Sequence, residues 1–197
     1  MTPVPFVGLT GGVGAGKSTA LAELERLGAA TLSTDAVVHD LYGSAAVRDA
    51  VVERFGPEVA PNGAVDRATL AARAFATPED RAWLEGMLWP RVGARIAEWR
   101  EEQLAHDPPP VAMVVEVPLL FEAGMEGAFD ATIAVVADED VRTQRAGGRG
   151  HAAVDERVAR QLPQDEKARR ADHAVRNDGS LTELQRNLSA ILGMLRV

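Results

Sequence analysis

The sequence predicts a three-layer α/β protein with a central parallel sheet and a helical insertion. Short apolar segments at residues 4–9 and 29–33 enclose a glycine-rich loop and a helical pattern, which is the βαβ order of a parallel sheet. Residues 111–117 are apolar on both faces apart from Glu116, as expected for a central strand that is covered on both sides. Residues 36–107 have a nearly continuous helical pattern, and this stretch therefore predicts an insertion between strands.

The other elements follow in order along the chain. Leucines at helical spacing predict a helix over residues 18–27, which Gly28 ends. Thr77, followed by Pro78 and two acidic residues, is typical of a helix start. Two further strands are expected at residues 131–137 and 174–176, and two further helices at residues 154–162 and after the capping box of Ser180 and Glu183. The expected division is a core of residues 1–40, 108–145 and 163–197, an insertion at 41–107 and a lid at 146–162.

Composition and charge argue against several classes of protein. The chain has 197 residues, 46% of them apolar and 25% charged, as in soluble globular proteins. A net charge of −8 argues against general nucleic-acid binding, which needs a basic face. There is no cysteine, and the start carries no signal-peptide pattern. The longest apolar stretch, residues 111–121, is much shorter than the roughly 20 residues of a membrane span, so we expect a cytoplasmic protein without membrane or nucleic-acid partners.

A phosphate-binding motif follows the first predicted strand. Residues 11–18, Gly-Gly-Val-Gly-Ala-Gly-Lys-Ser, fit the pattern G-x-x-x-x-G-K-[ST]. Glycines allow backbone N–H groups to turn toward phosphate oxygens, and the helix N-terminus that follows favours anions. Lys17 can reach the β- and γ-phosphates, and Ser18 can ligate Mg²⁺. The predicted ATP-binding residues of this loop are Gly12, Val13, Gly14, Ala15, Gly16, Lys17, Ser18 and Thr19.

Missing motifs narrow the class of nucleotide-binding protein. The only two lysines are Lys17 and Lys167, and neither lies in the N-K-x-D motif with which GTPases recognise guanine. The L-S-G-G-Q signature of transporter ATPases is also absent. A small-molecule kinase remains, and such an enzyme needs an acceptor site beside the loop and arginines that neutralise the transferring phosphoryl group.

Asp35 is the candidate catalytic base. It follows the second predicted strand at the carboxyl edge of the sheet, where ligands bind in open α/β folds. A carboxylate at that edge can orient an acceptor hydroxyl and take its proton. The residues alone support a helix N-cap at this position equally well, since aspartate is a preferred cap.

Arg145, Arg149 and Arg157 lie in or beside a glycine-rich stretch. One interpretation is a lid that closes over ATP and excludes water. The alternative is a solvated basic loop, which the composition of the stretch also allows. The four histidines show no metal-ligand spacing, so the metal expected from the sequence is the Mg²⁺ that accompanies ATP.

Taken together, the motifs resemble those of the dephospho-coenzyme A kinase family. Residues 8–19 are similar to that family's start, G-L-T-G-G-[IV]-G-[SA]-G-K-S-[T], and residues 117–122, Val-Pro-Leu-Leu-Phe-Glu, are similar to its V-P-L-L-x-E turn. Residues 171–179 resemble its ending, A-D-x-x-x-x-N-x-G. The family's lid and the segment after it are matched by Arg145, Arg149, Arg157, Gln161 and Lys167. The similarity therefore spans nearly the whole chain in the family's order.

This resemblance implies a P-loop kinase with a nucleotide core, a helical coenzyme A domain and a short lid. It implies transfer of the γ-phosphoryl group of ATP, with Mg²⁺, to the ribose 3′-hydroxyl of dephospho-coenzyme A. In the family pattern Asp35 matches the proposed base, Arg149 the lid arginine on the ATP phosphates and Asn177 a residue near the adenine. The implied catalytic residues are Asp35, Lys17 and Arg149, the further ATP-binding residues are Arg145 and Asn177, and the acceptor-binding residues are Thr10, Asp35, Pro118, Leu119, Leu120 and Glu122.

Two positions depart from the family pattern. Ser33 stands where the first aspartate of D-x-D is expected, and Trp89 stands where the histidine of L-H-P is expected. Physical reasoning leaves two alternative functions open, another small-molecule P-loop kinase such as a nucleoside monophosphate kinase, and a non-catalytic nucleotide switch. The expected partners are ATP and dephospho-coenzyme A, bound by a monomer or a weak homo-oligomer.

Overall fold

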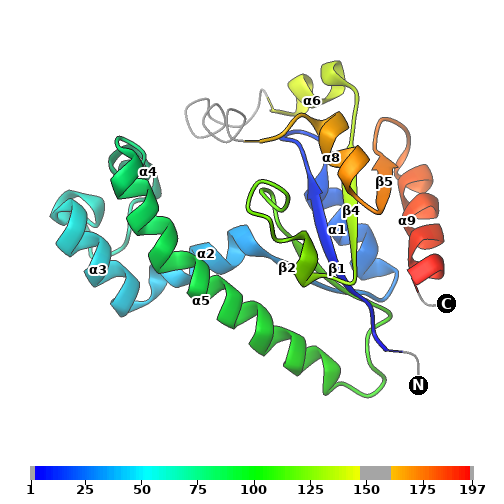
Figure 1. The fold of residues 1–197 in the computed structure, drawn as a ribbon, viewed down its shortest axis with the longest axis horizontal. Coiled ribbons are helices and arrows are strands. Elements are labelled where there is room, and N and C mark those ends of the chain that lie inside the picture. The colour runs from blue at the N-terminus through cyan, green and yellow to red at the C-terminus, as the bar shows by residue number, and fades with distance from the viewer. Residues whose placement is uncertain (1–2, 147–160, 196–197) are drawn as a thin grey trace. The chain divides into compact units, whose positions relative to one another are not determined.

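The computed structural model describes residues 3–146 and 161–195 (Figure 1). The chain forms two compact units. The sheet unit comprises Met1–Ser33 and Arg100–Val197, and the helical unit comprises Thr34–Trp99.

Five parallel strands form the sheet of the sheet unit. In spatial order they are β2 (Ala30–Ser33), β3 (Met113–Glu116), β1 (Phe6–Gly11), β4 (Ala131–Val136) and β5 (His173–Arg176). This order confirms the predicted parallel α/β fold and places β1, the strand that leads into the phosphate loop, at the centre. β1 and β2 follow one another in sequence but are not neighbours in the sheet, because β3 lies between them.

The first strand runs further toward the loop than the sequence predicts. Its predicted range was residues 4–9, whereas β1 ends at Gly11. Thr10 and Gly11 pair in register with Ala134 and Val135 of β4, and this pairing holds the start of the phosphate loop in the sheet. The extension is not visible in the local sequence because it depends on a strand more than 120 residues away.

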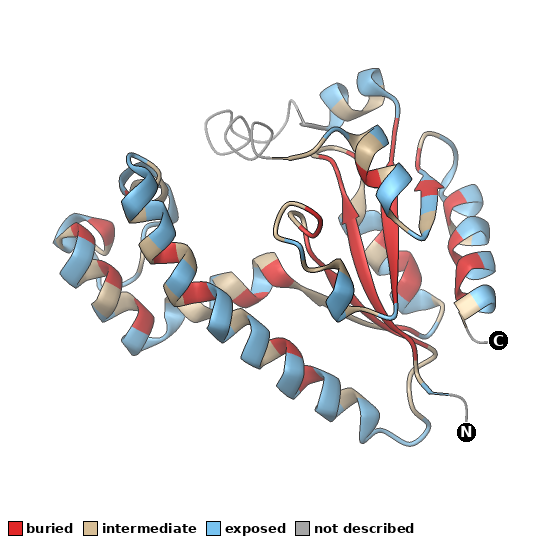
Figure 2. Cartoon of the chain, viewed as in Figure 1, coloured by how far each residue is buried: buried red, intermediate tan, exposed pale blue. Residues whose placement is uncertain are grey.

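Helices cover both faces of this sheet. Its helices are α1 (Lys17–Arg26), α6 (Glu139–Ala146), α8 (Gln164–Arg170) and α9 (Leu181–Leu195), together with the short η2 (Glu126–Ala128). On one face Val7 and Leu9 pack with α1 and α9 in an apolar core. On the other face Gly8 and Thr10 meet α8 and the chain that follows β3. Figure 2 shows that the central strands are buried along their length.

The capping box predicted for the last helix is present. Ser180 N donates to Glu183 Oε2 at 2.8 Å, and Glu183 N donates to Ser180 Oγ at 3.3 Å. These two bonds satisfy backbone groups that the start of a helix would otherwise leave unpaired. They fix the start of α9 directly after β5, so that its apolar face covers the core beside α1.

The helical unit is built around its own apolar cluster. Its elements are α2 (Thr34–Gly43), α3 (Ala45–Phe55), η1 (Pro57–Val59), α4 (Arg67–Ala74) and α5 (Pro78–Leu104), whose last residues belong to the sheet unit. The buried cluster consists of Val47, Val51, Phe55, Val59, Leu70, Ala74, Leu84 and Leu88. Phe55 meets Trp83 edge to face at 5.5 Å between ring centroids. The predicted helix start is confirmed, since Asp80 N donates to Thr77 Oγ1 at 3.1 Å.

In the part of the chain that the structure describes, no helix has both the length and the apolar character that crossing a bilayer requires.

Candidate active site

The phosphate loop joins β1 to α1, and its glycines are required by the backbone and by close neighbours. Gly14 and Gly16 have φ values of 78° and 88°, in the left-handed region that side chains rarely adopt. A Cβ atom on Gly14 would lie 2.4 Å from the Arg142 carbonyl oxygen, and one on Gly16 would lie 2.0 Å from Asn177 Nδ2. The loop therefore has this conformation because glycine stands at both positions.

Lys17 begins α1, and its side chain lies along the loop. The Nζ atom donates to the carbonyl oxygens of Gly11 at 3.1 Å and Gly12 at 3.2 Å. Ser18 and Thr19 follow in the first turn of the helix and are exposed. Within residues 3–146 and 161–195, no side chain caps this helix end. The loop thus combines a lysine ammonium with the N-terminus of a helix, which is the arrangement that binds phosphate groups.

Three side chains from the second half of the chain hold the loop in place. Arg142 Nε donates to the Val13 carbonyl oxygen at 3.0 Å. The Gln161 carboxamide oxygen accepts from Val13 N at 3.1 Å. Asn177 Nδ2 donates to the Ala15 carbonyl oxygen at 2.9 Å. We call Arg142, Gln161 and Asn177 the loop supports, because together they fix the backbone of the phosphate loop from the outside.

The predicted ATP-binding residues outside the loop are partly brought together. Arg145 Nη1 donates to the Asn177 carbonyl oxygen at 3.0 Å, and Asn177 is buried beside Gly16. Arg145 closes helix α6, whereas the sequence suggested that it opens the glycine-rich loop. Arg149 and Arg157, and with them the predicted lid and the helix expected at residues 154–162, lie outside the described residues.

Arg142 is the residue at this site that sequence reasoning missed. It lies in α6, where it also pairs with Glu139 at 2.7 Å. A charged helix with an (i, i+3) ion pair is typical of a solvated surface, so its sequence carries no signal for a loop contact. Only the spacing of Arg142 from the end of β4 could have indicated that it faces the carboxyl edge of the sheet.

The chain that follows β3, residues 117–122, carries most of the predicted acceptor-binding residues; we call it the acceptor turn. Leu120 is fully buried against Gly8 of β1, and Pro118 and Leu119 are half-buried. Thr10 Oγ1 donates to the Pro118 carbonyl oxygen at 3.4 Å. The structure therefore brings Thr10 and the predicted residues of the turn into one cluster at the end of β1.

A buried lysine fixes the acceptor turn from the α8 side. Lys167 has an exposed fraction of 0%. Its Nζ atom donates to the Pro118 carbonyl oxygen at 2.6 Å and pairs with Glu122 Oε1 at 2.9 Å. Glu122 Oε1 also accepts from Leu162 N at 2.7 Å. Burial lowers the pKa of Lys167, and the Glu122 carboxylate opposes that shift.

Asp35, the predicted base, is the second residue of α2 and belongs to the helical unit. The helix begins at Thr34 and not at Ala36, so Asp35 lies inside the first turn and not at the N-cap position. Ser33, two residues earlier, is the last residue of β2 and pairs in register with Glu116 of β3. The structure thus begins this helix two residues before the expected start, with an acidic side chain in its first turn.

Trp89, the second departure from the family pattern, lies on α5 of the helical unit with an exposed fraction of 43%.

In the part of the chain that the structure describes, no group of three or more histidine, aspartate or glutamate residues is placed to hold a metal ion. Mg²⁺ bound with ATP takes most of its ligands from phosphates and water, so a single protein hydroxyl such as that of Ser18 is a sufficient ligand from the protein.

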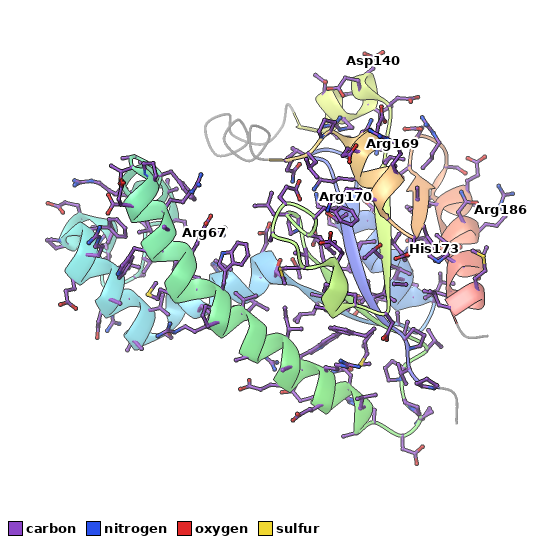
Figure 3. The ribbon with its side chains drawn as sticks, in the orientation of Figure 1. Arg67, Asp140, Arg169, Arg170, His173 and Arg186 are labelled. Carbon is purple, nitrogen blue, oxygen red and sulfur yellow. The ribbon has the colours of Figure 1, made fainter. Side chains whose placement is uncertain are left out.

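Figure 3 shows Arg186 extending outward from α9, on the side of this helix that faces away from the sheet.

The chain is similar to known proteins over the residues of both units. A family model described as dephospho-CoA kinase matches residues 5–183. A dephospho-CoA kinase of Anaeromyxobacter dehalogenans is 42% identical over 198 residues, which cover 96% of this chain and 92% of that protein. The crystal structure of a Thermus thermophilus protein has a TM-score of 0.79 at 33% identity and covers 99% of both chains. A dephospho-CoA kinase from Campylobacter jejuni has the same fold, with a TM-score of 0.63 at 21% identity over 98% of this chain and 97% of that one.

Proposed function

The chain belongs to the dephospho-CoA kinase family and is a kinase, and we propose that it transfers the γ-phosphoryl group of ATP to the ribose 3′-hydroxyl of dephospho-coenzyme A. The products would be coenzyme A and ADP, in the final step of coenzyme A biosynthesis. The observation that carries the proposal is the phosphate loop at the end of the central strand β1, where Gly14 and Gly16 with positive φ lead into α1 and Lys17 lies along the loop. The family supplies the identity of the acceptor.

The phosphates of ATP would bind to the backbone N–H groups of the loop and to the first turn of α1. Lys17 would exchange its contacts with the Gly11 and Gly12 carbonyl oxygens for the β- and γ-phosphates. Ser18 would hold Mg²⁺, whose charge would offset the charge that develops on the phosphates. The support for Ser18 is its exposed position directly after Lys17.

Asp35 would act on the acceptor. The ribose 3′-oxygen would attack the γ-phosphorus while the bond to the β–γ bridging oxygen breaks, and the Asp35 carboxylate would take the hydroxyl proton. One observation supports this role: Asp35 follows by two residues the carboxyl end of β2, and ligands of open α/β folds bind at that edge of the sheet. The helical unit would hold the coenzyme A moiety, and Thr10 and the acceptor turn would line the acceptor side of the loop.

Arginines would complete the phosphate site. Arg145 is supported by its bond to the Asn177 carbonyl oxygen beside the phosphate loop. Arg149 is supported by the family motif alone, and it would neutralise the transferring group from the lid. Asn177 would lie near the adenine of ATP. We further propose that the enzyme works in the cytoplasm as a monomer or weak homo-oligomer, without nucleic acid; its acidic net charge of −8 supports the last point.

One experiment separates this function from its alternatives. ADP release is measured with Mg-ATP and dephospho-coenzyme A, with AMP, with other nucleoside monophosphates, and with no acceptor. Fast release only with dephospho-coenzyme A supports the proposal, and formation of coenzyme A is verified by mass spectrometry. Faster release with a monophosphate would favour a nucleoside monophosphate kinase. Nucleotide binding without any acceptor-dependent turnover would favour a switch.

A further inference from the structure

The carbonyl oxygen of Pro118 is a meeting point for side chains from three parts of the chain. It accepts from Lys167 Nζ at 2.6 Å, from Thr10 Oγ1 at 3.4 Å and from Gln161 Nε2 at 3.4 Å. Pro118 is the second residue of the acceptor turn. A carbonyl with several donors has a well-defined position, because each donor restricts it from a different direction.

Gln161 differs from the other two donors in what its other end contacts. Its carboxamide oxygen accepts from the backbone N–H of Val13 in the phosphate loop at 3.1 Å, while its carboxamide nitrogen donates to Pro118 in the acceptor turn. One planar amide group thus spans from the loop proposed to bind ATP to the turn proposed to bind the acceptor. The two contacts have a fixed separation, because the oxygen and the nitrogen belong to the same rigid group.

Each of the two segments also has an anchor of its own. Arg142 Nε holds Val13 through its carbonyl oxygen at 3.0 Å. Lys167 holds the acceptor turn at both ends, through the Pro118 carbonyl oxygen and the Glu122 carboxylate. Loss of the Gln161 carboxamide would therefore leave both segments supported and would remove a direct tie between them.

We propose that Gln161 is a positioning residue that sets the acceptor turn against the phosphate loop, so that the acceptor hydroxyl is aligned with the γ-phosphorus. This inference rests on the proposed function, because alignment is read out as phosphoryl transfer to dephospho-coenzyme A. Its physical basis is the steep dependence of transfer on geometry: a displacement of about 1 Å can cost about 10²-fold in rate. Gln161 itself touches neither reacting atom and acts through Val13 and Pro118.

The test compares two glutamines of the same segment. Gln164 makes the same kind of paired contact, with its oxygen accepting from Ala137 N at 3.2 Å and its nitrogen donating to Ala137 O at 2.8 Å, and both bonds go to the residue after β4 and not to the loop or the turn. Gln161→Met and Gln164→Met each remove one carboxamide without adding charge. For Gln161→Met we expect kcat to fall about tenfold or more, with KM for both substrates within about threefold of wild type. Gln164→Met should keep kcat within about twofold.

A second measurement distinguishes positioning from a general loss of structure. The amount of coenzyme A formed per ADP released should fall in Gln161→Met, because a misaligned hydroxyl competes less well with water for the phosphoryl group. Partial unfolding would lower transfer and hydrolysis together and would leave this ratio unchanged. Thermal melting of both variants shows whether they are equally folded.

Two results would overturn the inference. One is equal kcat for Gln161→Met and Gln164→Met, and the other is a fall in kcat with an unchanged ratio of coenzyme A to ADP. Failure of the proposed function would look different, because wild-type enzyme would then not turn over dephospho-coenzyme A at all.

Discussion

The contacts that stabilise the sheet unit internally span longer stretches of sequence than those that stabilise the helical unit. In the sheet unit, Lys167 Nζ bonds to Thr10 across 157 residues of sequence, and Asn177 Nδ2 bonds to Ala15 across 162. In the helical unit, Asp80 N bonds to Thr77 three residues away, and Arg54 pairs with Asp80 across 26 residues at 2.6 Å. A compact apolar cluster packs the helices of this unit together. The geometry of the phosphate loop therefore depends on the second half of the chain, whereas the helical unit depends on its neighbouring helices.

The largest effect is expected at Asp35, the one predicted catalytic residue in the helical unit. A substitution there tests whether this unit takes part in the chemistry. Asp35→Asn keeps the shape of the side chain and removes the proton acceptor. We expect kcat to fall by about 10²–10⁴-fold with little change in ATP affinity. Loss of a negative charge from the first turn of α2 should cost at most about 1 kcal/mol of stability. Steady-state kinetics and thermal melting measure the two effects.

The matched control for this change is Asp40→Asn, which removes an exposed carboxylate from the same helix. It should leave kcat near the wild-type value. An Asp35→Asn enzyme that keeps more than about a tenth of wild-type kcat would remove Asp35 as the base. The helical unit would then contribute binding alone, and all the chemistry would belong to the sheet unit.

Lys17 is the corresponding residue of the sheet unit. Lys17→Met removes a charge from the phosphate loop, and we expect a fall of about 10²–10³-fold in kcat, with the fold retained. Lys17→Arg should rescue little, since a planar guanidinium does not replace a compact ammonium in this loop. Arg186→Met, on the outer face of α9, is the control that loses the same charge far from the loop. Near-normal turnover by Lys17→Met would contradict the phosphate-site assignment.

The long-range contacts predict where stability is most easily lost in the sheet unit. Lys167→Met would leave the Glu122 carboxylate partly buried without its cation. Removal of one partner from a buried ion pair costs about 3–5 kcal/mol, and we expect the lower end because Glu122 retains some exposure. The additional change Glu122→Gln should recover part of this loss. Denaturant unfolding measures both variants, and a double variant no more stable than Lys167→Met would show that the charge pair is not the cause.

The positions of most elements could be predicted from local sequence. All five predicted strands lie within two residues of the observed bounds at each end, because short apolar segments between turn residues indicate buried strands. The capping box of Ser180 and the helix start at Thr77 were found because caps depend on neighbouring residues. The family expected from the motifs is also the one that the comparisons show.

Features that depend on distant residues could not be predicted in this way. The position of β3 between β2 and β1 follows from packing of the whole sheet and not from any one segment. Arg142 was missed because its contact with Val13 spans 129 residues and its own helix is an ordinary charged one. Gln161 was noticed only through the family resemblance. Lys167 also stood out as one of the two lysines of the chain, but a single lysine has no pattern that predicts its contacts.

The smallest expected effect concerns Asp172, whose long-range contact lies away from the phosphate loop. Its carboxylate accepts from Thr132 Oγ1 at 2.7 Å and from Thr132 N at 2.8 Å, 40 residues away, and these bonds lower the pKa of Asp172. A lowered pKa means that the folded state binds the proton less readily than the unfolded state. The stabilisation is therefore complete above the unfolded pKa of about 3.9 and is lost as pH falls through the folded value.

Asp172→Asn should consequently lower stability by about 0.5–1 kcal/mol at pH 7, a modest loss because the carboxylate is exposed. Denaturant unfolding at a series of pH values should show the difference from wild type shrinking below about pH 4. Turnover of dephospho-coenzyme A at pH 7 should not change, since this contact touches neither the phosphate loop nor the acceptor turn. A clear fall in kcat would mean that long-range contacts throughout the sheet unit shape the site, and not only those of Arg142, Gln161, Lys167 and Asn177.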